Sequence, residues 1–540
     1  MTILNLNEAS EWATDYLGKD VSKSNISYLV QYGKVKKLQT EEKVTGVDQA
    51  ELKKYYDMNV KTKEEEWKES LGDDLNWDLS FSELREKDTT KHVHRLHPYK
   101  GKFIPQLVEY FLDENTTEFK KTAYFKPGDT VLDPFMGSGT TLVQAGELEL
   151  NSIGIDVSQF NYEMSKVKTG TYQSEELKTI LETALANSQK FISETFDEEF
   201  DKTLRDKIAE FNKLHFPNPE YKYQVKQGEI DPGAYSAEKE DIFFTENIEM
   251  MKNLKPARDF AEDELDEAWG ESEFLKKWYN GRILRELAFY NNQLAEVGSA
   301  EIRAVMRIIM SRVARSCRST THSDLATLKE AQILPYYCTK HYKICTPINS
   351  IATRLKQYTN GTIRRLAEYA DLRGKSVCSA VIHGDSREID IFAEVAKGNP
   401  EFAKALAGRK MDGVFTSPPY VGQIDYHEQH AYAYELFAIE RADELEIGPL
   451  YRGKGKKAQE EYVVGIAAVL NNVAKYVKDD GDFFLVANDK YGLYPKIAEL
   501  VKMEIVAEHK RPVLNRTERD RAPYSEIIFH LKKKKGLFIY

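Results

Sequence analysis

A short strand that ends in an acid and runs into a glycine turn constrains the fold of this 540-residue chain more than any other segment. Residues 130–132 are β-branched or apolar, Asp133 ends the predicted strand, and Gly137 and Gly139 lead into a predicted helix from Thr140. Glycines in such a turn let a ligand approach the backbone closely. The turn lacks the lysine of a phosphate-binding loop and the Gly-x-Gly-x-x-Gly spacing. It therefore predicts an α/β fold with a ligand at this strand end.

Other predicted strands follow the same design and alternate with helical segments. Residues 152–156 end in Asp156, residues 379–383 lead into Gly384-Asp385, and residues 413–416 end before Ser417. Further strands are predicted at 481–488, 504–508 and 524–531. Alternation of this kind predicts a mostly parallel sheet with helices on both faces, and ligands bind at the carboxyl ends of its strands. We therefore expect Asp133, Asp156, Asp385 and Ser417 to lie together.

The residues after the strand at 413–416 are Ser417-Pro418-Pro419-Tyr420. Prolines fix the local backbone and carry no N–H, so the carbonyls before them remain free to accept hydrogen bonds. The tyrosine adds a flat face. The combination predicts a slot for a planar group with an amine, such as a flipped nucleobase. The alternative is an ordinary Pro-Pro turn after a core strand.

Together, the two motifs resemble the cofactor and catalytic motifs of DNA amino-methyltransferases, which use S-adenosylmethionine. The serine form of the second motif most resembles the cytosine-N4 branch. The segment His97-Pro98-Tyr99-Lys100-Gly101-Lys102-Phe103-Ile104-Pro105 resembles the element that lines the cofactor pocket. The similarity covers about residues 91–165 and 376–532, and implies a Rossmann-like methyltransferase with a seven-stranded sheet. The cofactor motif precedes the catalytic motif, which is not usual for cytosine-N4 members and leaves adenine N6 open.

The resemblance implies a role for each motif residue. Phe103 and Pro105 would flank the methionine end of the cofactor, and Asp133 would contact its ammonium group. Asp156 would bind the ribose hydroxyls and Asp385 the adenine amine, while Phe135 and the Gly137/Gly139 turn would shape the pocket. Ser417 and the Pro418 carbonyl would hold the target amine, and Tyr420 would stack on the base.

The charge distribution points to a local nucleic-acid surface. The chain has a net charge of −11, yet residues 303–375 hold fourteen Arg and Lys against four Asp and Glu. Such an asymmetry predicts a face that contacts DNA phosphates, with a solvated helical surface as the alternative. The candidates are Arg312, Arg315 and Arg318, together with Arg511 and Arg516 in a basic run, 509–521, predicted to be a loop between the last two strands.

Four consecutive regions are predicted. Residues 1–90 form an N-terminal helical extension, and 91–170 form the first part of the methyltransferase core. Residues 171–375 form a mainly helical insert for target recognition, and 376–540 form the second part of the core with the catalytic motif. The implied partners are S-adenosylmethionine and double-stranded DNA, with a restriction endonuclease as a further candidate.

The sequence does not predict a membrane protein, a secreted protein or a metal site. No apolar stretch approaches the roughly 20 residues of a membrane span, and no signal pattern begins the chain, so we expect a cytoplasmic protein without a membrane partner. Four cysteines show no CxxC spacing, and His92, His94 and His97 lack a carboxylate or cysteine nearby in sequence, so no metal is predicted. His427 and His430 could be acid-base groups or packing residues. The remaining alternatives are an RNA or protein amine methyltransferase, or a catalytically silent DNA-recognition module.

Overall fold

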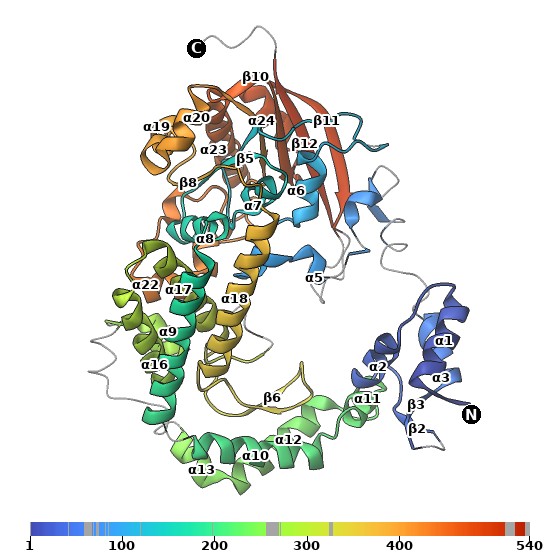
Figure 1. Cartoon of the computed structure of the whole chain (residues 1–540). Helices are drawn as coiled ribbons and strands as arrows, with labels where there is room; N and C mark the ends of the chain where they lie inside the picture. Colours follow the sequence, from blue (N-terminus) through green and yellow to red (C-terminus); the bar gives the residue numbers. More distant parts are fainter. Residues whose placement is uncertain are drawn as a thin grey trace. The chain divides into compact units, whose positions relative to one another are not determined.

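The computed structural model describes the chain except residues 1, 41–42, 59–66, 68–69, 72–74, 82, 85, 119, 197, 255–268, 271, 323, 325–327, 514–523 and 535–540. Seven strands form one sheet in the order β11-β12-β10-β9-β4-β5-β8 (Figure 1). Their bounds are β4 Thr130–Asp133, β5 Asn151–Asp156, β8 Ser379–His383, β9 Met411–Thr416, β10 Val477–Ala487, β11 Met503–Pro512 and β12 Ser525–Lys533. β12 pairs antiparallel with β10 and β11, and the other neighbours pair in parallel. The predicted mostly parallel α/β sheet is confirmed.

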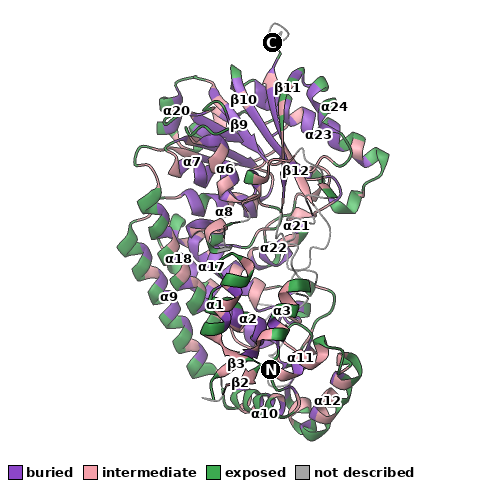
Figure 2. Cartoon of the chain, turned by 90° about the vertical axis from the view of Figure 1, so that its right-hand side faces the viewer, coloured by how far each residue is buried: buried purple, intermediate pink, exposed green. Residues whose placement is uncertain are grey.

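Alternate residues of the central strands pack against different helical layers. In β10, Phe483 and Leu485 belong to the core shared with helices α19 Ile391–Gly398, α20 Pro400–Leu406, α23 Lys456–Ala474 and α24 Tyr494–Leu500. Phe484 and Val486 belong to the core shared with α6 Pro105–Leu112 and α7 Thr140–Glu147. Successive strand side chains point to opposite faces, so a continuous apolar run is buried on both sides. The strands accordingly appear buried in Figure 2.

The chain divides into two compact units whose boundaries differ from the four predicted regions. The sheet unit comprises residues 67–189, 287–316 and 352–540. It therefore takes helix α17, Ala300–Ser316, and helix α18, Ala352–Leu372, out of the predicted insert. Two contacts explain this: Arg307 of α17 pairs with Glu163 at 3.0 Å, and the Tyr369 hydroxyl of α18 donates to the Val143 carbonyl at 3.3 Å.

The sheet unit also contains α8 Gln159–Thr169, most of α9 Ser174–Thr195, part of α16 Gly281–Glu296, and short elements near the strand ends. These are η1 Trp77–Ser80, α5 Glu86–Thr89, η2 His92–Arg95, α21 Tyr426–Gln429, α22 Ala431–Phe437, η3 Asp443–Leu445 and η4 Leu450–Arg452. None of the helices in the described ranges is long and apolar enough to cross a membrane.

The second unit, called here the helical unit, comprises residues 1–66, 190–286 and 317–351. Its helices are α1 Leu6–Leu17, α2 Lys23–Gln31, α3 Gln49–Met58, α10 Glu199–His215, α11 Glu220–Lys226, α12 Pro232–Glu246, α13 Ile248–Leu254 and α15 Glu273–Trp278. It also holds the hairpin β6 Tyr336–Cys338 and β7 Lys343–Cys345. The N-terminal region is more than helical: β1 Ile3–Asn5, β3 Thr45–Asp48 and β2 Leu38–Gln39 form a small sheet. Strands of two to four residues are too short to show a period in the sequence.

Candidate active site

Four adjacent strands of the sheet carry the polar residues singled out in the sequence. Asp133 ends β4, Asp156 ends β5, Ser417 follows β9, and Asp385 comes two residues after β8. A pocket with roughly 870 Å³ of empty space, its mouth included, lies at this edge. The predicted residues on its wall are Phe103, Phe135, Gly137, Asp156, Asp385, Ser417 and Pro419. The sheet order therefore brings the cofactor and catalytic motifs to one cavity, as their positions at strand ends predicted.

Asp156 is held by three donors and keeps acceptor capacity toward the pocket. Its Oδ1 accepts from the backbone N–H of Ser158 at 2.8 Å and from Asn161 Nδ2 at 3.1 Å. Its Oδ2 accepts from the Gly137 N–H at 2.9 Å. A carboxylate has about four lone-pair sites, so Oδ2 can accept another hydrogen bond. Burial raises the pKa of Asp156, and the hydrogen bonds from Ser158, Asn161 and Gly137 oppose that rise.

Asp385 is oriented by a neighbour that the sequence analysis did not select. The guanidinium of Arg387 donates to both carboxylate oxygens, with Nη2 at 2.6 Å from Oδ2 and Nε at 2.9 Å from Oδ1. The Arg387 backbone N–H adds a bond to Oδ1 at 2.9 Å. The bidentate pair holds the carboxylate in one orientation at the pocket wall.

The two glycines of the turn have different neighbours. A Cβ on Gly137, whose φ is +49°, would lie 2.9 Å from the Tyr99 hydroxyl on the pocket wall. A Cβ on Gly139, whose φ is +74°, would lie 2.8 Å from Ser165 Oγ of helix α8. Gly137 therefore shapes the pocket as predicted, while Gly139 allows close packing of the turn on α8 and does not line the pocket.

Asp133 lies behind the pocket wall and joins the two motifs. It is 1% exposed, and its Oδ1 accepts from Thr416 Oγ1 at 2.5 Å and from the Phe135 N–H at 3.1 Å. Burial raises the pKa of Asp133 to about 6. Asp133 therefore ties the ends of β4 and β9 together through Oδ1, and its contact with a ligand ammonium stays a prediction. Pro105 is likewise buried, at the first turn of α6.

The serine of the catalytic motif is fixed by the neighbouring strand. Ser417 Oγ donates to the Val486 carbonyl at 3.1 Å, at the end of β10. A hydroxyl that gives its proton to a carbonyl keeps its two lone pairs as acceptors. Pro418 is buried and Pro419 lines the pocket. Ser417 is thus an acceptor at the wall of the cavity.

Tyr420 belongs to a buried polar network and is not on the pocket wall itself. Its hydroxyl donates to Glu526 Oε1 at 2.9 Å, and Arg511 donates to Glu526 Oε2 at 2.9 Å. Arg511 is 3% exposed and also binds the Leu79 carbonyl at 3.1 Å. The prediction that Arg511 contacts DNA is wrong, because its guanidinium is occupied inside the fold. Residues 509–512 belong to strand β11, so the predicted loop begins later than expected.

The other basic candidates are placed differently from one another. Arg312 is half-buried on α17, where it donates to the Leu96 carbonyl at 3.1 Å and lies over the Tyr358 ring. Arg315 is half-buried on the same helix, whereas Arg318 is 6% exposed and lies in the helical unit. Burial of Arg318 argues against a phosphate contact. Arg516 lies outside the described residues.

Several pocket residues had no individual role predicted from the sequence: Tyr99, Lys102, Asn161, Tyr426 and Glu446. His427, considered above as an acid-base or packing residue, also lines the pocket. Lys102 donates to the His94 carbonyl at 2.7 Å, and burial lowers its pKa to about 8. His427 is buried and pairs with Glu446 through Nδ1, while its Nε2 has no hydrogen-bond partner among the described residues, so both interpretations of this histidine stay predictions. Tyr99 belongs to the pocket-lining segment noted above, but Glu446 has no signal in the sequence, because a loop brings it to the site.

The histidines at 92, 94 and 97 are buried parts of the sheet unit. Glu147 lies 2.9 Å from His92 Nε2, so a carboxylate that is distant in sequence does join them. Lys91 Nζ occupies the same carboxylate at 2.6 Å, and its charge would oppose a cation there. His97 Nε2 lies 2.9 Å from Ser311 Oγ. These contacts account for His92 and His97, whereas both ring nitrogens of His94 are buried without a hydrogen-bond partner among the described residues.

Comparison with known proteins agrees with this geometry. A family model described as DNA methylase matches residues 19–167. The Type II methyltransferase M.MjaII of Methanocaldococcus jannaschii is 49% identical over 527 residues, which are 98% of this chain and 96% of that protein. M.MvaI of Kocuria varians is 38% identical over 97 residues, 18% of this chain and 19% of that protein. No solved structure matches.

The relative from Methanocaldococcus jannaschii extends over both compact units. The family model covers the glycine turn and the strand ends at Asp133 and Asp156. Members of this family use S-adenosylmethionine as methyl donor. With its pocket built at those strand ends, this chain belongs to the S-adenosylmethionine-dependent DNA amino-methyltransferases.

Proposed function

We propose that this methyltransferase transfers a methyl group to the exocyclic N4 amine of cytosine in duplex DNA, by direct transfer to a flipped base. The observation that carries the proposal is Ser417, whose hydroxyl donates to the Val486 carbonyl and offers its lone pairs at the pocket wall. The serine form of the motif supports cytosine through the family resemblance.

The pocket residues fit S-adenosylmethionine. Asp156 has a free acceptor position for the ribose hydroxyls, and Asp385, oriented by Arg387, can accept from the adenine amine. Phe103 and Phe135 supply apolar wall. When bound, the cofactor supplies a methyl group already activated by a sulfonium. The protein therefore has to bring the amine to it in the correct orientation, without a covalent intermediate of its own.

The amine of a nucleobase is a weak nucleophile because its lone pair is delocalised into the ring. Ser417 Oγ and the Pro418 carbonyl would accept hydrogen bonds from its two hydrogens. Two acceptors draw the nitrogen toward tetrahedral geometry and localise the lone pair toward the methyl group. Catalysis is then positioning combined with electrostatic stabilisation.

Tyr420 is the proposed stacking partner of the base. Its hydroxyl is tied to Glu526, and Arg511 holds that carboxylate from the other side. Tyr420 follows Pro419 of the pocket wall, and a ring fixed in this way would stack without losing further rotamer freedom on binding. Base stacking on an aromatic side chain contributes about 1–3 kcal/mol.

Duplex DNA would meet the sheet unit on its basic helices, with Arg312 and Arg315 of α17 retained as candidates. As whole residues both are only half-buried, unlike Arg318 and Arg511, although part of the Arg312 guanidinium is occupied by the Leu96 carbonyl and the Tyr358 ring. The Type II relatives support a role in a restriction-modification system, with a restriction endonuclease as the partner enzyme.

The test is to express the protein in a host without DNA methylation, digest its DNA to nucleosides and identify them by mass spectrometry. We expect N4-methyldeoxycytidine. N6-methyldeoxyadenosine, the alternative favoured by the order of the motifs, would show that the target base is adenine and not cytosine, and would leave the proposed geometry of transfer unchanged. Methylation of RNA with none in DNA would refute a DNA substrate.

A further inference from the structure

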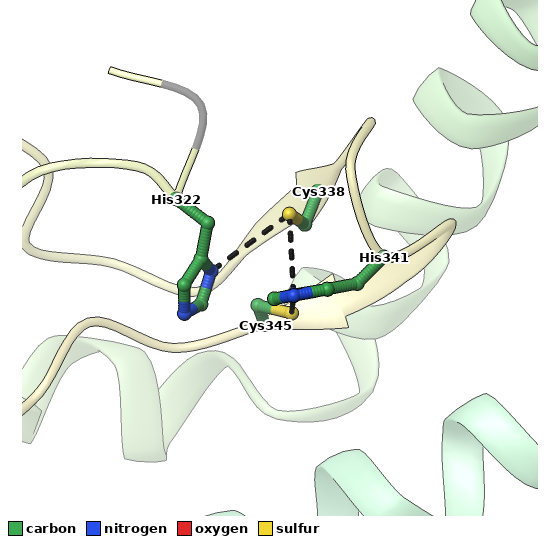
Figure 3. Close-up of side chains that lie close together, drawn as sticks. All are labelled: His322, Cys338, His341 and Cys345. Atoms are coloured by element: carbon green, nitrogen blue, oxygen red, sulfur yellow. Dashed lines mark hydrogen bonds between the residues drawn. The ribbon is translucent and has the colours of Figure 1, made fainter. Parts of the chain in front are cut away.

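We propose that the helical unit binds one zinc ion through His322, Cys338, His341 and Cys345. The four side chains converge in Figure 3, and one ligand atom from each, a ring nitrogen or a sulfur, lies within 4.8 Å of the other three. Two thiolates and two imidazoles form one of the usual ligand sets of structural zinc. The site is separate from the methyltransferase pocket, and none of its four residues lines that pocket.

Three nitrogen–sulfur distances among the ligand atoms are close to the corresponding edges of a zinc tetrahedron. Cys338 Sγ lies 3.5 Å from His341 Nδ1 and 3.8 Å from His322 Nδ1, and Cys345 Sγ lies 3.5 Å from His341 Nδ1. With Zn–S of about 2.3 Å and Zn–N of about 2.0–2.1 Å, tetrahedral angles place N and S about 3.6 Å apart. Ordinary packing of thiols and imidazoles has no reason to produce three such contacts around one centre.

A hairpin presents three of the ligands. Cys338 ends β6, Cys345 ends β7, and His341 lies in the turn, where its backbone N–H donates to the Cys338 carbonyl at 3.1 Å. The resulting spacing, Cys-x2-His-x3-Cys, is as short as those of known zinc-binding turns. Cys338 is 1% exposed and Cys345 8%, so the sulfur atoms are shielded from solvent.

His322 supplies the fourth ligand from the loop before the hairpin. Tyr336 orients it: the Tyr336 hydroxyl lies 2.7 Å from His322 Nδ1 and accepts from the His322 backbone N–H at 2.8 Å. Binding zinc through Nδ1 would exchange the first of these bonds for a metal bond, while the second keeps the backbone in place. The metal would thereby close a loop of fifteen residues between His322 and Cys338.

The hairpin is anchored, so the ligands meet without metal in a prearranged site. The side-chain amide of Asn212 in α10 binds the backbone of Ile344 twice. It donates to the Ile344 carbonyl and accepts from the Ile344 N–H, each at 2.8 Å. The Tyr337 N–H donates to Glu240 of α12 at 2.7 Å. Four protein ligands leave no position open for substrate, so the predicted role is structural.

Two other groups of possible metal ligands occur in the described residues, but in each of them a carboxylate is already bound by a Lys or Arg. His92, His94 and Glu147 include a carboxylate bound by Lys91. His427, Asp443 and Glu446 include Asp443, which Arg441 binds at 2.7 Å. No Lys or Arg has a hydrogen bond or ion pair with the four residues of the proposed site among the interactions of the described chain. Soft sulfur ligands also favour zinc over magnesium or calcium.

The experiment measures metal in the full-length protein purified without chelators, by inductively coupled plasma mass spectrometry. We expect about one zinc per chain, the stoichiometry of a closed four-ligand site. Cys338→Ser and Cys345→Ser should each lose it, whereas the control Cys378→Ser, at a free cysteine of the sheet unit, should retain it. Retention of full zinc by both ligand variants would overturn the assignment.

A second measurement protects the test against variants that fail to fold. Treating the wild-type protein with an organic mercurial should release the zinc, detected with a chromogenic chelator, as the thiolates are titrated. Replacement by Co²⁺ should give the visible and thiolate charge-transfer absorption of tetrahedral cobalt. A folded wild-type protein that contains no zinc after growth with added zinc, or that carries a Cys338–Cys345 disulfide in its peptide map, would refute the proposal.

Discussion

The methyltransferase pocket and the Cys/His site both bring together polar side chains from separate segments. In the pocket these side chains face a cavity, whereas in the Cys/His site they face one another. In the pocket, Asp156 and Ser417 use some of their hydrogen-bonding capacity on the backbone and keep the remainder for the cavity. In the Cys/His site, Cys338, His341 and Cys345 face one another around a small centre. The first arrangement suits a ligand that enters and leaves, and the second suits an ion that stays.

The two regions also differ in what brings their residues together. The pocket residues follow β9, β4, β5 and β8, which are neighbours in one parallel sheet. The carboxyl ends of such strands must share an edge, so the convergence follows from the fold class. The Cys/His site depends on one turn and one loop, and no general rule of topology places His322 beside the hairpin.

The largest expected effect is at Arg511, which binds Glu526 in the buried network of Tyr420. Arg511→Ala would leave Glu526 buried without its cation, which costs about 3–5 kcal/mol of unfolding free energy. Urea unfolding measures it, with Lys510→Ala on the same strand as control. If Arg511→Ala is stable and instead lowers the salt dependence of DNA binding, Arg511 contacts phosphate and its assignment to the buried network fails.

The next effect is on turnover. Ser417→Ala should lower kcat by about 10²–10³, the range for losing one preorganised hydrogen-bonding group at a reacting centre. Cofactor affinity should stay the same, because Ser417 acts on the amine. Single-turnover methylation and calorimetry separate the two. The control is Ser379→Ala, whose hydroxyl meets Ser152 at the start of β8, away from the pocket. Equal losses in both variants would remove Ser417 from the mechanism.

A pH experiment tests the positioning role of Asp133. Its pKa in the fold is about 6, above its ordinary value of 3.8, so the protonated group stabilises the fold at low pH. This contribution is complete below about pH 4 and is lost as the pH rises through 6, up to about 3 kcal/mol. Unfolding of wild-type and Asp133→Asn proteins from pH 4 to 8 should show the wild type losing stability relative to the variant. Parallel pH profiles would contradict this.

A smaller effect is expected on cofactor affinity. Asp156→Asn replaces a charged acceptor and should weaken S-adenosylmethionine binding by roughly 1.5–3 kcal/mol. Calorimetry measures the change, and Asp129→Asn, before the first residue of β4, is the control. Unchanged affinity in a folded Asp156→Asn protein would rule out the ribose contact.

The smallest effect on cofactor affinity is expected from a variant of the Cys/His site, and it tests whether that site and the pocket are independent. Cys345→Ser should lose zinc while binding S-adenosylmethionine with unchanged affinity, because no residue of the Cys/His site lines the pocket. Calorimetry on the folded variant tests this. A loss of cofactor affinity comparable to that of Asp156→Asn would show that the two sites depend on each other.

The sequence by itself determined the sheet, its strand ends and the place of the pocket. Alternating strands and helices allow few topologies, and residues such as Asp156 and Ser417 lie next to a strand in the chain itself. The position of a residue at a strand end depends on its neighbours in the chain and not on where the strand packs, so it can be predicted from the sequence.

Tertiary structure decided what distant residues do to one another. Arg511 was assigned to DNA from its type and position, yet Glu526 binds its guanidinium inside the fold, and Asp133 acquires a bond to Thr416 that the sequence does not indicate. The helices α17 and α18 joined the sheet unit through side-chain contacts that their composition does not specify. His322 and Cys338 meet for the same reason: contacts between residues far apart in the chain depend on packing, which leaves no period or spacing in the sequence.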